Sequence, residues 1–331
     1  CKLINYANKY NAEFERFAGQ KSPAKKDTGH KYILRDSGKC ILCGLCVRVC
    51  SQVMGVGAIG LAGRGFTTVV SPEFYKSLGD SQCISCGQCV SLCPTGALVE
   101  KVPFKKNVPL REICTATHCT GCAAKCAINV FSNGNSITRC APANGNIICT
   151  YGKFGLSKLA NVGRLKVCKS GEETISLECA AEIISDKTAC FSPAEIAVTV
   201  CENMTDNELE QAAELSQKLG GALVDMGNID RDISADSCER FEKIFGTEFY
   251  IGANREKAAS LGAVDSDAID FSKIKAVISF GGKTSEGNFD FAAVQSAKET
   301  GDVSLPFALS VECVGTIGEA DISPALNPTY S

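Results

Sequence analysis

The spacing of hydrophobic residues changes along the chain. In the first ten residues they recur at helical spacing and predict a helix within residues 1–19. Residues 20–37 are polar and Lys-rich, which predicts a linker or surface loop. From about residue 160 onward, strand-like and helix-like segments alternate. Such alternation is typical of a parallel sheet with helices on its faces.

The individual elements of this second part have recognisable boundaries. The pattern predicts strands at residues 195–201, 222–226, 275–280 and 303–310, and helices at residues 205–219 and 289–300. Thr205 and Glu208 stand at capping-box spacing before the first of these helices, and Gly220 follows its end.

Cysteine is the unusual feature of the composition, with 21 residues in a chain of 331. A secreted disulfide scaffold is usually short, and these cysteines cluster at spacings that suit a metal. Reduced thiols favour the cytoplasm. The net charge of −3 gives no reason to expect nucleic acid, and no apolar run reaches the length of a membrane span. No signal peptide is visible, but the sequence starts at Cys1, so we expect N-terminal sequence to be missing.

Two related cysteine blocks within residues 38–102 form an internal repeat. Both have the bacterial ferredoxin spacing C-x2-C-x2-C-x3-C, in which the fourth cysteine ligates the other cluster. The crossed pattern assigns one [4Fe–4S] cluster to Cys40, Cys43, Cys46 and Cys93, and a second to Cys83, Cys86, Cys89 and Cys50. Gly44 and Gly87 suit loops whose N–H groups turn towards cluster sulfurs.

A third block has a different spacing. Cys119, Cys122 and Cys126 form C-x2-C-x3-C, and Cys149 lies further along the chain. A distant thiolate can complete a cluster begun by three local ones, so the block predicts a third [4Fe–4S] site. Zinc is the alternative, although a zinc ribbon uses two C-x2-C pairs and only one is present here.

These motifs resemble known redox families. The stretch CTGCAAKC, then Arg139, Pro142, Asn144-Gly145 and CTYGKFG, resembles the [4Fe–4S] domain of molybdopterin oxidoreductases. The stretches KCILCGLCVRVC, GVGAIGLAGRGFTTVVSP and CISCGQCVSLCPTGAL resemble the large iron–sulfur subunit of respiratory complex I. They also resemble parts of NAD-dependent formate dehydrogenases and [FeFe] hydrogenases. The tail segment Ala320-Asp321-Ile322-Ser323-Pro324-Ala325 resembles a segment of the same family.

The resemblance implies an organisation in four parts. Residues 1–35 would end a His/Cys cluster module, with Cys1 as the last ligand of an upstream cluster, and would continue into a linker. Residues 36–105 would form a two-cluster ferredoxin-like domain, and residues 106–160 a molybdopterin-oxidoreductase-type [4Fe–4S] domain. Residues 161–331 would form a reduced, Rossmann-like α/β domain. The fold class is therefore α/β with small α+β iron–sulfur modules.

The main functional hypothesis is an electron-relay subunit with three clusters and no molybdenum. The resemblance implies a flavin-bearing, NADH-oxidising partner and further redox subunits, with any membrane association made through them. One alternative is the iron–sulfur part of a molybdopterin-dependent formate dehydrogenase, although little chain follows Cys149. The other is a hydrogenase, whose additional cysteine motifs are not found downstream.

Other candidate residues have simpler explanations. Cys114 and Cys140 fall outside the matched quartets and are interpreted as bystanders. Core packing is expected for the remaining cysteines, which are Cys168, Cys179, Cys190, Cys201, Cys238 and Cys313. His30 and His118 are weak ligand candidates. The segment from Gly281 to Thr284 lacks the full phosphate-loop pattern, and no dinucleotide fingerprint is present.

Overall fold

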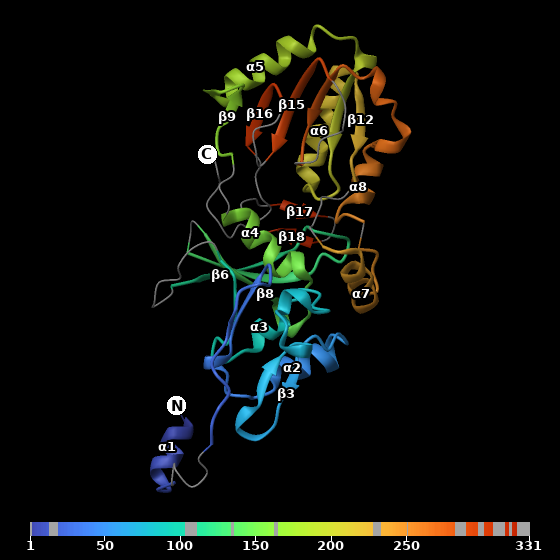
Figure 1. Cartoon of the computed structure of the whole chain (residues 1–331). Helices are drawn as coiled ribbons and strands as arrows, with labels where there is room; N and C mark the ends of the chain where they lie inside the picture. The colour runs from blue at the N-terminus through green and yellow to red at the C-terminus, as the bar shows by residue number, and fades with distance from the viewer. Residues whose placement is uncertain are drawn as a thin grey trace. The chain divides into compact units, whose positions relative to one another are not determined.

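The computed structural model describes residues 2–12, 19–102, 111–133, 136–161, 165–227, 233–249, 251–281, 289–296, 301–306, 315–317 and 320–322. The chain divides into two compact units. Unit 1 comprises Cys1–Cys83 and Gln88–Lys101, and unit 2 comprises Ile84–Gly87 and Val102–Ser331. Figure 1 labels their elements.

Unit 1 consists of short strands joined by cysteine-bearing turns. Its strands are β1 (Lys26–Asp27), β2 (Ile33–Asp36), β3 (Gly60–Ala62), β4 (Val69–Ser71) and β5 (Leu98–Glu100). Its helices are α1 (Lys2–Lys9), α2 (Leu45–Arg48), the π-helical turn η2 (Val49–Val53) and α3 (Gln88–Leu92). β1, β2 and β5 form an antiparallel sheet, and β3 and β4 form a hairpin. Ile33, Leu78 and Leu98 are buried in this unit.

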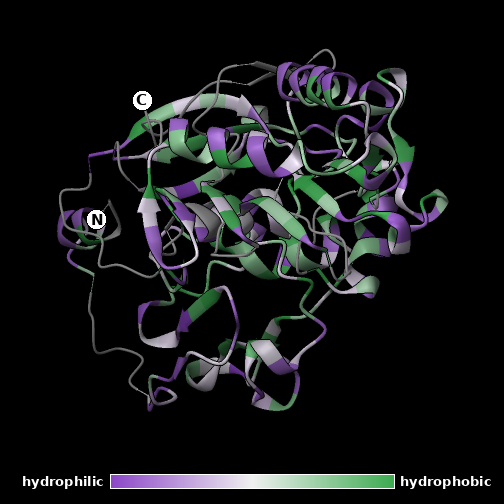
Figure 2. Ribbon diagram, turned by 90° about the horizontal axis from the view of Figure 1, so that it is seen from above, coloured by the Kyte–Doolittle hydropathy of each residue, from purple (hydrophilic) through white to green (hydrophobic). Residues whose placement is uncertain are grey.

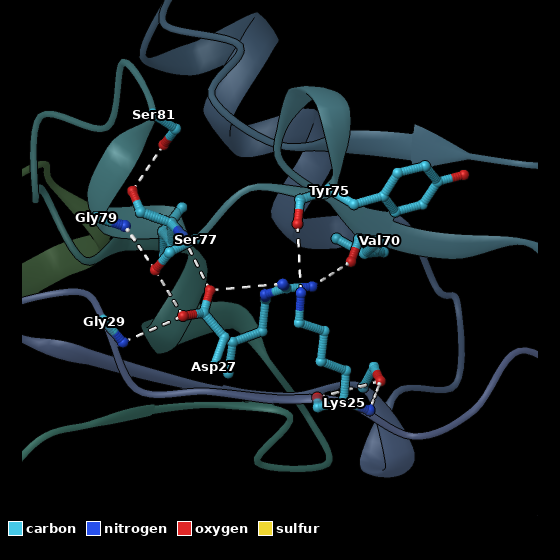
Figure 3. A network of polar contacts seen from close by, with 11 residues as sticks. Lys25, Asp27, Gly29, Val70, Tyr75, Ser77, Gly79 and Ser81 are labelled. Carbon is cyan, nitrogen blue, oxygen red and sulfur yellow. Dashed lines mark hydrogen bonds and ion pairs between the residues drawn. The ribbon is translucent and has the colours of Figure 1, made fainter.

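A buried polar network connects β1 and β2 with residues 77 and 78. The Asp27 carboxylate accepts hydrogen bonds from Ser77 Oγ at 2.6 Å, Leu78 N at 2.9 Å and Gly29 N at 3.1 Å, and pairs with Arg35 Nη2 at 3.5 Å. Figure 3 shows Gly29 and Ser77 directed at Asp27. Burial alone would raise the pKa of Asp27, but these hydrogen bonds and the Arg35 charge lower it below its usual value.

The prediction of a linker or surface loop over residues 20–37 is therefore wrong for part of that segment. β1 and β2 lie within it, and both belong to the sheet of unit 1. The Lys-rich composition obscured a short alternation in which Ile33 and Arg35 point inwards. Arg35 is tolerated inside because Asp27 neutralises its charge.

Unit 2 contains a small antiparallel sheet that precedes the α/β part. Its strands are β6 (Ile113–His118), β7 (Ala127–Ser132) and β8 (Ile137–Pro142), paired in that order. β7 alternates between buried and half-buried positions, with Ile128 and Val130 fully buried. The π-helical turn η7 (Tyr151–Gly155) and α4 (Leu156–Asn161) follow, and β17 (Gly315–Ile317) pairs with β18 (Ala320–Ile322).

The α/β part of unit 2 is organised around one eight-stranded sheet with the order β10-β9-β16-β15-β14-β11-β12-β13. Its strands are β9 (Cys168–Ser170), β10 (Glu173–Ile175), β11 (Ile196–Val200), β12 (Ala222–Asp225), β13 (Val264–Asp265), β14 (Ala276–Ser279), β15 (Phe291–Ser296) and β16 (Val303–Pro306). β11 to β16 run parallel, whereas β9 and β10 add an antiparallel edge. The parallel strands have the doubly wound order 3-2-1-4-5-6, which reverses between β11 and β14.

Helices cover this sheet. They are α5 (Leu177–Thr188), α6 (Asp206–Leu219), α7 (Ala235–Phe245) and α8 (Arg255–Ser260). Leu209, Ala212 and Ala213 of α6 are in one buried cluster with Val198 and Val200 of β11. Figure 1 shows α6 beside β12, and α5 near β9 and β16. In Figure 2 the helical ribbons carry both green and purple stretches, as amphipathic helices do.

Most predicted elements of the α/β part are confirmed by the structure. The predicted capping box is present, because Thr205 accepts from Glu208 N while the Glu208 carboxylate accepts from Thr205 N. Gly220 ends α6 in the left-handed conformation, with φ of 67°. The predicted strands correspond to β11, β12, β14 and β16, although residues 307–310 lie outside the described part.

The helix predicted at residues 289–300 is wrong. Residues 291–296 form β15, which pairs in parallel with β14 and β16. Its sequence FAAVQS is short and apolar on both faces, because Phe291 and Ala293 belong to one cluster while Val294 is buried too. A strand in the middle of a parallel sheet shows no alternation, so its periodicity does not separate it from a buried helix.

Candidate metal centres

A pocket in unit 1 is lined by the four cysteines predicted for the first cluster. Cys40, Cys43 and Cys46 come from the first block, whereas Cys93 comes from the end of the second. The structure therefore brings these four side chains to one cavity, as the crossed pattern requires. That they ligate iron stays a prediction.

The thiols of this pocket have contrasting environments. Burial raises the pKa of Cys46 to about 11, and the neighbouring Cys40, Cys43 and Cys93 add to the rise. Burial also acts on Cys93, but N–H groups of Leu98, Thr95 and Ala97 and the Thr95 hydroxyl lower its pKa overall. A sulfur held among inward-facing N–H groups is the environment that iron–sulfur clusters use.

The backbone of the two blocks repeats an uncommon conformation. Leu42 and Ser85, each just before the second cysteine of its block, have φ values of 56° and 59°. Gly44 and Gly87, just after that cysteine, have φ values of 72° and 67°. Left-handed residues turn successive N–H groups towards a shared anion, and Leu42 N donates to Cys40 Sγ at 3.4 Å. Sequence reasoning found the glycines but missed Leu42 and Ser85, whose side chains do not signal this conformation.

The second predicted quartet is divided between the two units. Cys86 lies in the segment grouped with unit 2, whereas Cys50, Cys83 and Cys89 lie in unit 1. Within unit 1, Cys50 is part of η2, which packs beside α3, where Cys89 is found. Cys86 and Cys89 are buried, and the other two are half-buried. Their role as ligands stays a prediction.

A second pocket lies in unit 2 and is lined by the third predicted quartet, Cys119, Cys122, Cys126 and Cys149. The first three come from the loop between β6 and β7, where Cys119 N donates to Cys126 O at 2.9 Å. Cys149 precedes η7, and Tyr151 and Phe249 complete the wall. π-Helical turns often occur at functional sites, and none was predicted from the sequence here.

The third quartet is more deeply buried than the first. Burial raises the pKa of Cys126 to about 11 and that of Cys149 to about 12, and neighbouring thiols add to both. Burial also raises the pKa of Cys119 well above its usual value, with contributions from Cys149 and Cys122. Such thiols must lose their protons when a metal binds, so metal binding here releases protons.

The two pockets can be compared with the ligand geometry of a zinc ion and of an iron–sulfur cluster. A zinc ion needs its ligands about 2.3 Å from a single point. Among the residues that the structure describes, no three His, Cys, Asp or Glu side chains are close enough together to hold one metal ion. Each pocket has four cysteines in its lining, and cysteine thiolates are the ligands that hold a [4Fe–4S] cluster.

The loop of the third quartet is held by the α/β part of unit 2. Asn203, just beyond β11, donates from its side chain to Thr120 O. Ala123 N donates to Ile251 O at 3.1 Å. Phe249, which lines the pocket, stacks on Phe241 of α7 with ring centroids 5.5 Å apart. The carboxyl edge of the parallel sheet therefore supports the cysteine loop.

The remaining cysteines and histidines do not line either pocket. Cys140 is fully buried in β8, and Cys114 is exposed on β6. The core-packing prediction agrees with the burial of Cys168, Cys201 and Cys238, whereas Cys179 is half-buried. It is wrong for Cys190, which is exposed after the end of α5. No disulfide occurs among the cysteines of the described residues, which exclude Cys1 and Cys313.

The histidines also have structural explanations. His30 is buried, and its Nδ1 accepts hydrogen bonds from the N–H groups of Tyr32 and Ile33, each at 3.0 Å. His118 ends β6 next to Cys119 but does not line the pocket. Of the segment from Gly281 to Thr284, the structure describes Gly281 alone, and the other three residues lie outside the described part.

Comparisons with known proteins agree with these cysteine patterns. Residues 39–97 match the family model of the 4Fe-4S dicluster domain. The NADP-reducing hydrogenase subunit HndD of Solidesulfovibrio fructosivorans is 42% identical over 30% of this chain and 17% of its own length. An NADH-quinone oxidoreductase subunit of Rhizobium meliloti (strain 1021) is 33% identical over 50% of this chain and 20% of its own. The alpha subunit of a Geobacter sulfurreducens NADPH-Fe(3+) oxidoreductase is 30% identical over 60% of this chain and 24% of its own length.

The chain is similar to the iron–sulfur subunits of nicotinamide-dependent oxidoreductases. The resemblance to the large iron–sulfur subunit of complex I is thereby confirmed, and a 4Fe-4S ferredoxin-like domain is present. These similarities support an electron-relay role. The chain spans between 17% and 33% of the length of the curated relatives it matches. In the described residues, every helix is too short or too polar to cross a membrane.

Proposed function

We propose that this chain is an electron-relay subunit that works between a flavin-bearing, NADH-oxidising partner and an acceptor subunit. The observation that carries the proposal is the pair of pockets, each lined by four cysteines from separated parts of the sequence. The names of the curated relatives add the nicotinamide substrate, because they include NADH- and NADPH-dependent oxidoreductases.

Three [4Fe–4S] clusters would be held by twelve cysteines. The first quartet is Cys40, Cys43, Cys46 and Cys93, the second is Cys83, Cys86, Cys89 and Cys50, and the third is Cys119, Cys122, Cys126 and Cys149. Cys1 would contribute to a further cluster with upstream ligands. When bound, such clusters accept and release single electrons. The protein tunes their potentials through N–H groups such as those around Cys93, through burial and through nearby charge.

The α/β part would serve as a support rather than as a catalytic domain. Its sheet has the order of a doubly wound fold, so we propose that residues 161–331 are the reduced, Rossmann-like domain of a molybdopterin-oxidoreductase-type subunit. Asn203 and Ile251, on the loops beyond the sheet, hold the loop of the third quartet. We expect no molybdenum on this chain, and we expect the protein to work in the cytoplasm with its partners.

The test is to isolate the native protein anaerobically with its partners and to add NADH. The proposal predicts a flavin-containing partner and cluster reduction by NADH, seen as electron paramagnetic resonance (EPR) signals that dithionite also produces. Removing the flavin subunit should abolish reduction by NADH and leave reduction by dithionite intact. Stoichiometric molybdenum or tungsten together with formate oxidation would overturn the relay function and favour a formate dehydrogenase.

A further inference from the structure

Lys153 is a charged side chain in an unusual place. It lies in η7, four residues after Cys149, and only 3% of its surface is exposed. Its backbone N–H donates to Cys149 O at 2.9 Å, and its ammonium donates to Cys140 O at 2.6 Å. Lysine is seldom buried, because removing an ammonium from water is costly unless negative charge compensates it.

The side chain of Lys153 also contacts the turn that carries Cys86. A Cβ atom added to Gly87 would lie 2.7 Å from Lys153 Cγ and 2.7 Å from Phe154 Cζ. The adjoining Thr150 hydroxyl donates to Ile84 O at 2.9 Å, within the same buried contact. The stem of Lys153 therefore lies between a turn with one predicted ligand of the second cluster and a turn with one ligand of the third.

Packing alone does not explain a lysine at this position. An apolar side chain of similar length would fill the space against Gly87, and a neutral amide could donate to the Cys140 carbonyl. The backbone of Lys153 lies one helical turn after Cys149, and its ammonium lies at the Cys140 carbonyl, so its positive charge is buried in the segment that follows Cys149. An iron–sulfur cluster held by four thiolates is negatively charged and becomes more so on reduction, so a nearby cation favours the reduced form.

We propose that Lys153 is a positioning residue that joins the Cys86 turn to the Cys149 turn and raises the reduction potential of the third cluster. The proposal rests on the electron-relay function proposed above. The deep burial of the third quartet would by itself disfavour the added negative charge of reduction. Lys153 offsets that penalty from a turn that also contacts Ile84 and Gly87, on either side of Cys86.

The test compares variants of the full chain after anaerobic reconstitution with iron and sulfide. Lys153→Gln retains a donor without the charge, and Lys153→Met retains the apolar stem. Lys153→Arg retains the charge, and Phe154→Leu alters the packing on Gly87 without altering charge. The signal of the third cluster is first identified as the one that Cys149→Ala removes. Potentials are then measured by EPR-monitored redox titration, and folding is checked by circular dichroism.

The expected result is that both neutral variants lower the potential of the third cluster. At a fixed applied potential, the ratio of reduced to oxidised cluster should fall at least tenfold, which is 59 mV for a one-electron couple. Lys153→Arg and Phe154→Leu should retain the native potential, and the potential of the first cluster should not change in any variant. If only the two neutral variants fail to assemble the third cluster, the charge is required for assembly and the proposed effect on the potential is overturned.

Other outcomes overturn the proposal. An unchanged potential in the neutral variants would exclude an electrostatic role, and an equal shift in Phe154→Leu would assign the effect to packing. Failure of Lys153→Arg along with the neutral variants would leave a purely structural role. A native chain with no third cluster signal would overturn the proposed function itself. That failure is recognised when the native chain is compared with Cys149→Ala, before any Lys153 variant is measured, so the two are distinguishable.

Discussion

The turns Cys43–Gly44 and Cys86–Gly87 occupy equivalent positions in the internal repeat, yet their surroundings differ. Both have left-handed residues on each side of the cysteine. Cys43 is exposed, and a Cβ added to Gly44 would meet nothing within 4 Å. Cys86 is buried, and the same addition at Gly87 would collide with Lys153 and Phe154.

The difference separates two requirements of a cluster ligand loop. The backbone conformation is common to both turns, so it follows from the cysteine spacing and from the need to turn N–H groups inwards. The packing is not repeated, because only the second turn belongs with unit 2 and contacts η7. One turn of the repeat is therefore open at the surface, and the other is fixed against the segment that carries Cys149.

The largest effect should come from replacing the two cysteines. Cys43→Ala and Cys86→Ala should each remove one cluster, or about four of about twelve irons. In addition, Cys86→Ala should lower the melting temperature of unit 2, because its turn is part of the buried contact with Thr150. Iron analysis and calorimetry measure both effects, and exposed Cys190→Ala is the control that should change neither. Equal melting behaviour of the two cysteine variants would contradict the comparison.

The stability of unit 1 should depend more on the polar network around Asp27 than on the turn at Cys43–Gly44. Asp27→Ala leaves the buried Arg35 guanidinium without its carboxylate, which should cost about 3–5 kcal/mol in the free energy of unfolding. Glu73→Ala, at an exposed position, should stay within about 0.5 kcal/mol of the native protein. Urea denaturation of the reconstituted protein measures both. A loss below about 1 kcal/mol for Asp27→Ala would show that the network is not needed for stability.

The two glycines offer a matched pair. Gly44→Ala and Gly87→Ala should share a penalty of about 1–2 kcal/mol, because both impose a left-handed conformation on alanine. Gly87→Ala should cost about 1–3 kcal/mol more, since its methyl group overlaps Lys153 and Phe154. Denaturant unfolding of the two variants measures the difference directly. Equal penalties would mean that the packing on η7 relaxes without cost.

The internal repeat also shows which features of the cysteine sites could be predicted from the sequence alone. Cysteine spacing predicts that Cys93 shares a cluster with the first block and that Cys149 shares one with the third block. The structure places each of these cysteines in the same pocket as its block, and that they bind iron stays a prediction. The spacing rule describes local wrapping of the chain, so it could not distinguish the open turn from the packed one. That distinction depends on Lys153 and Phe154, which lie far along the sequence from Gly87.

The same limit applies to the fold. The ends of α6 were predictable because Thr205, Glu208 and Gly220 act locally. β15 was not, since its identity comes from pairing with β14 and β16 rather than from its own pattern. Asp27 was also overlooked, because a single carboxylate in a Lys-rich segment gives no sign that Arg35 lies inside.

The smallest predicted effect concerns pH and unit 1. Burial lowers the pKa of His30, with the Lys101 charge acting in the same direction and Asp27 against it. His30 therefore takes up a proton at about pH 6.5 in the unfolded chain and only at a lower pH in the folded chain, so stability falls as the pH drops below about 6.5. His30→Gln should flatten the fall between about pH 7 and 5.5, where Asp27 does not titrate. An unchanged slope in urea denaturation would remove His30 as its source.

The central claim is that three separate quartets of cysteines hold three [4Fe–4S] clusters on this chain. Its most direct test is an anaerobic iron and acid-labile sulfide assay of the reconstituted full chain, together with a zinc determination. The account predicts about twelve irons and about twelve sulfides per chain, with zinc absent. A result of about eight irons, or zinc bound in place of the missing four, would contradict it at the third quartet, Cys119, Cys122, Cys126 and Cys149.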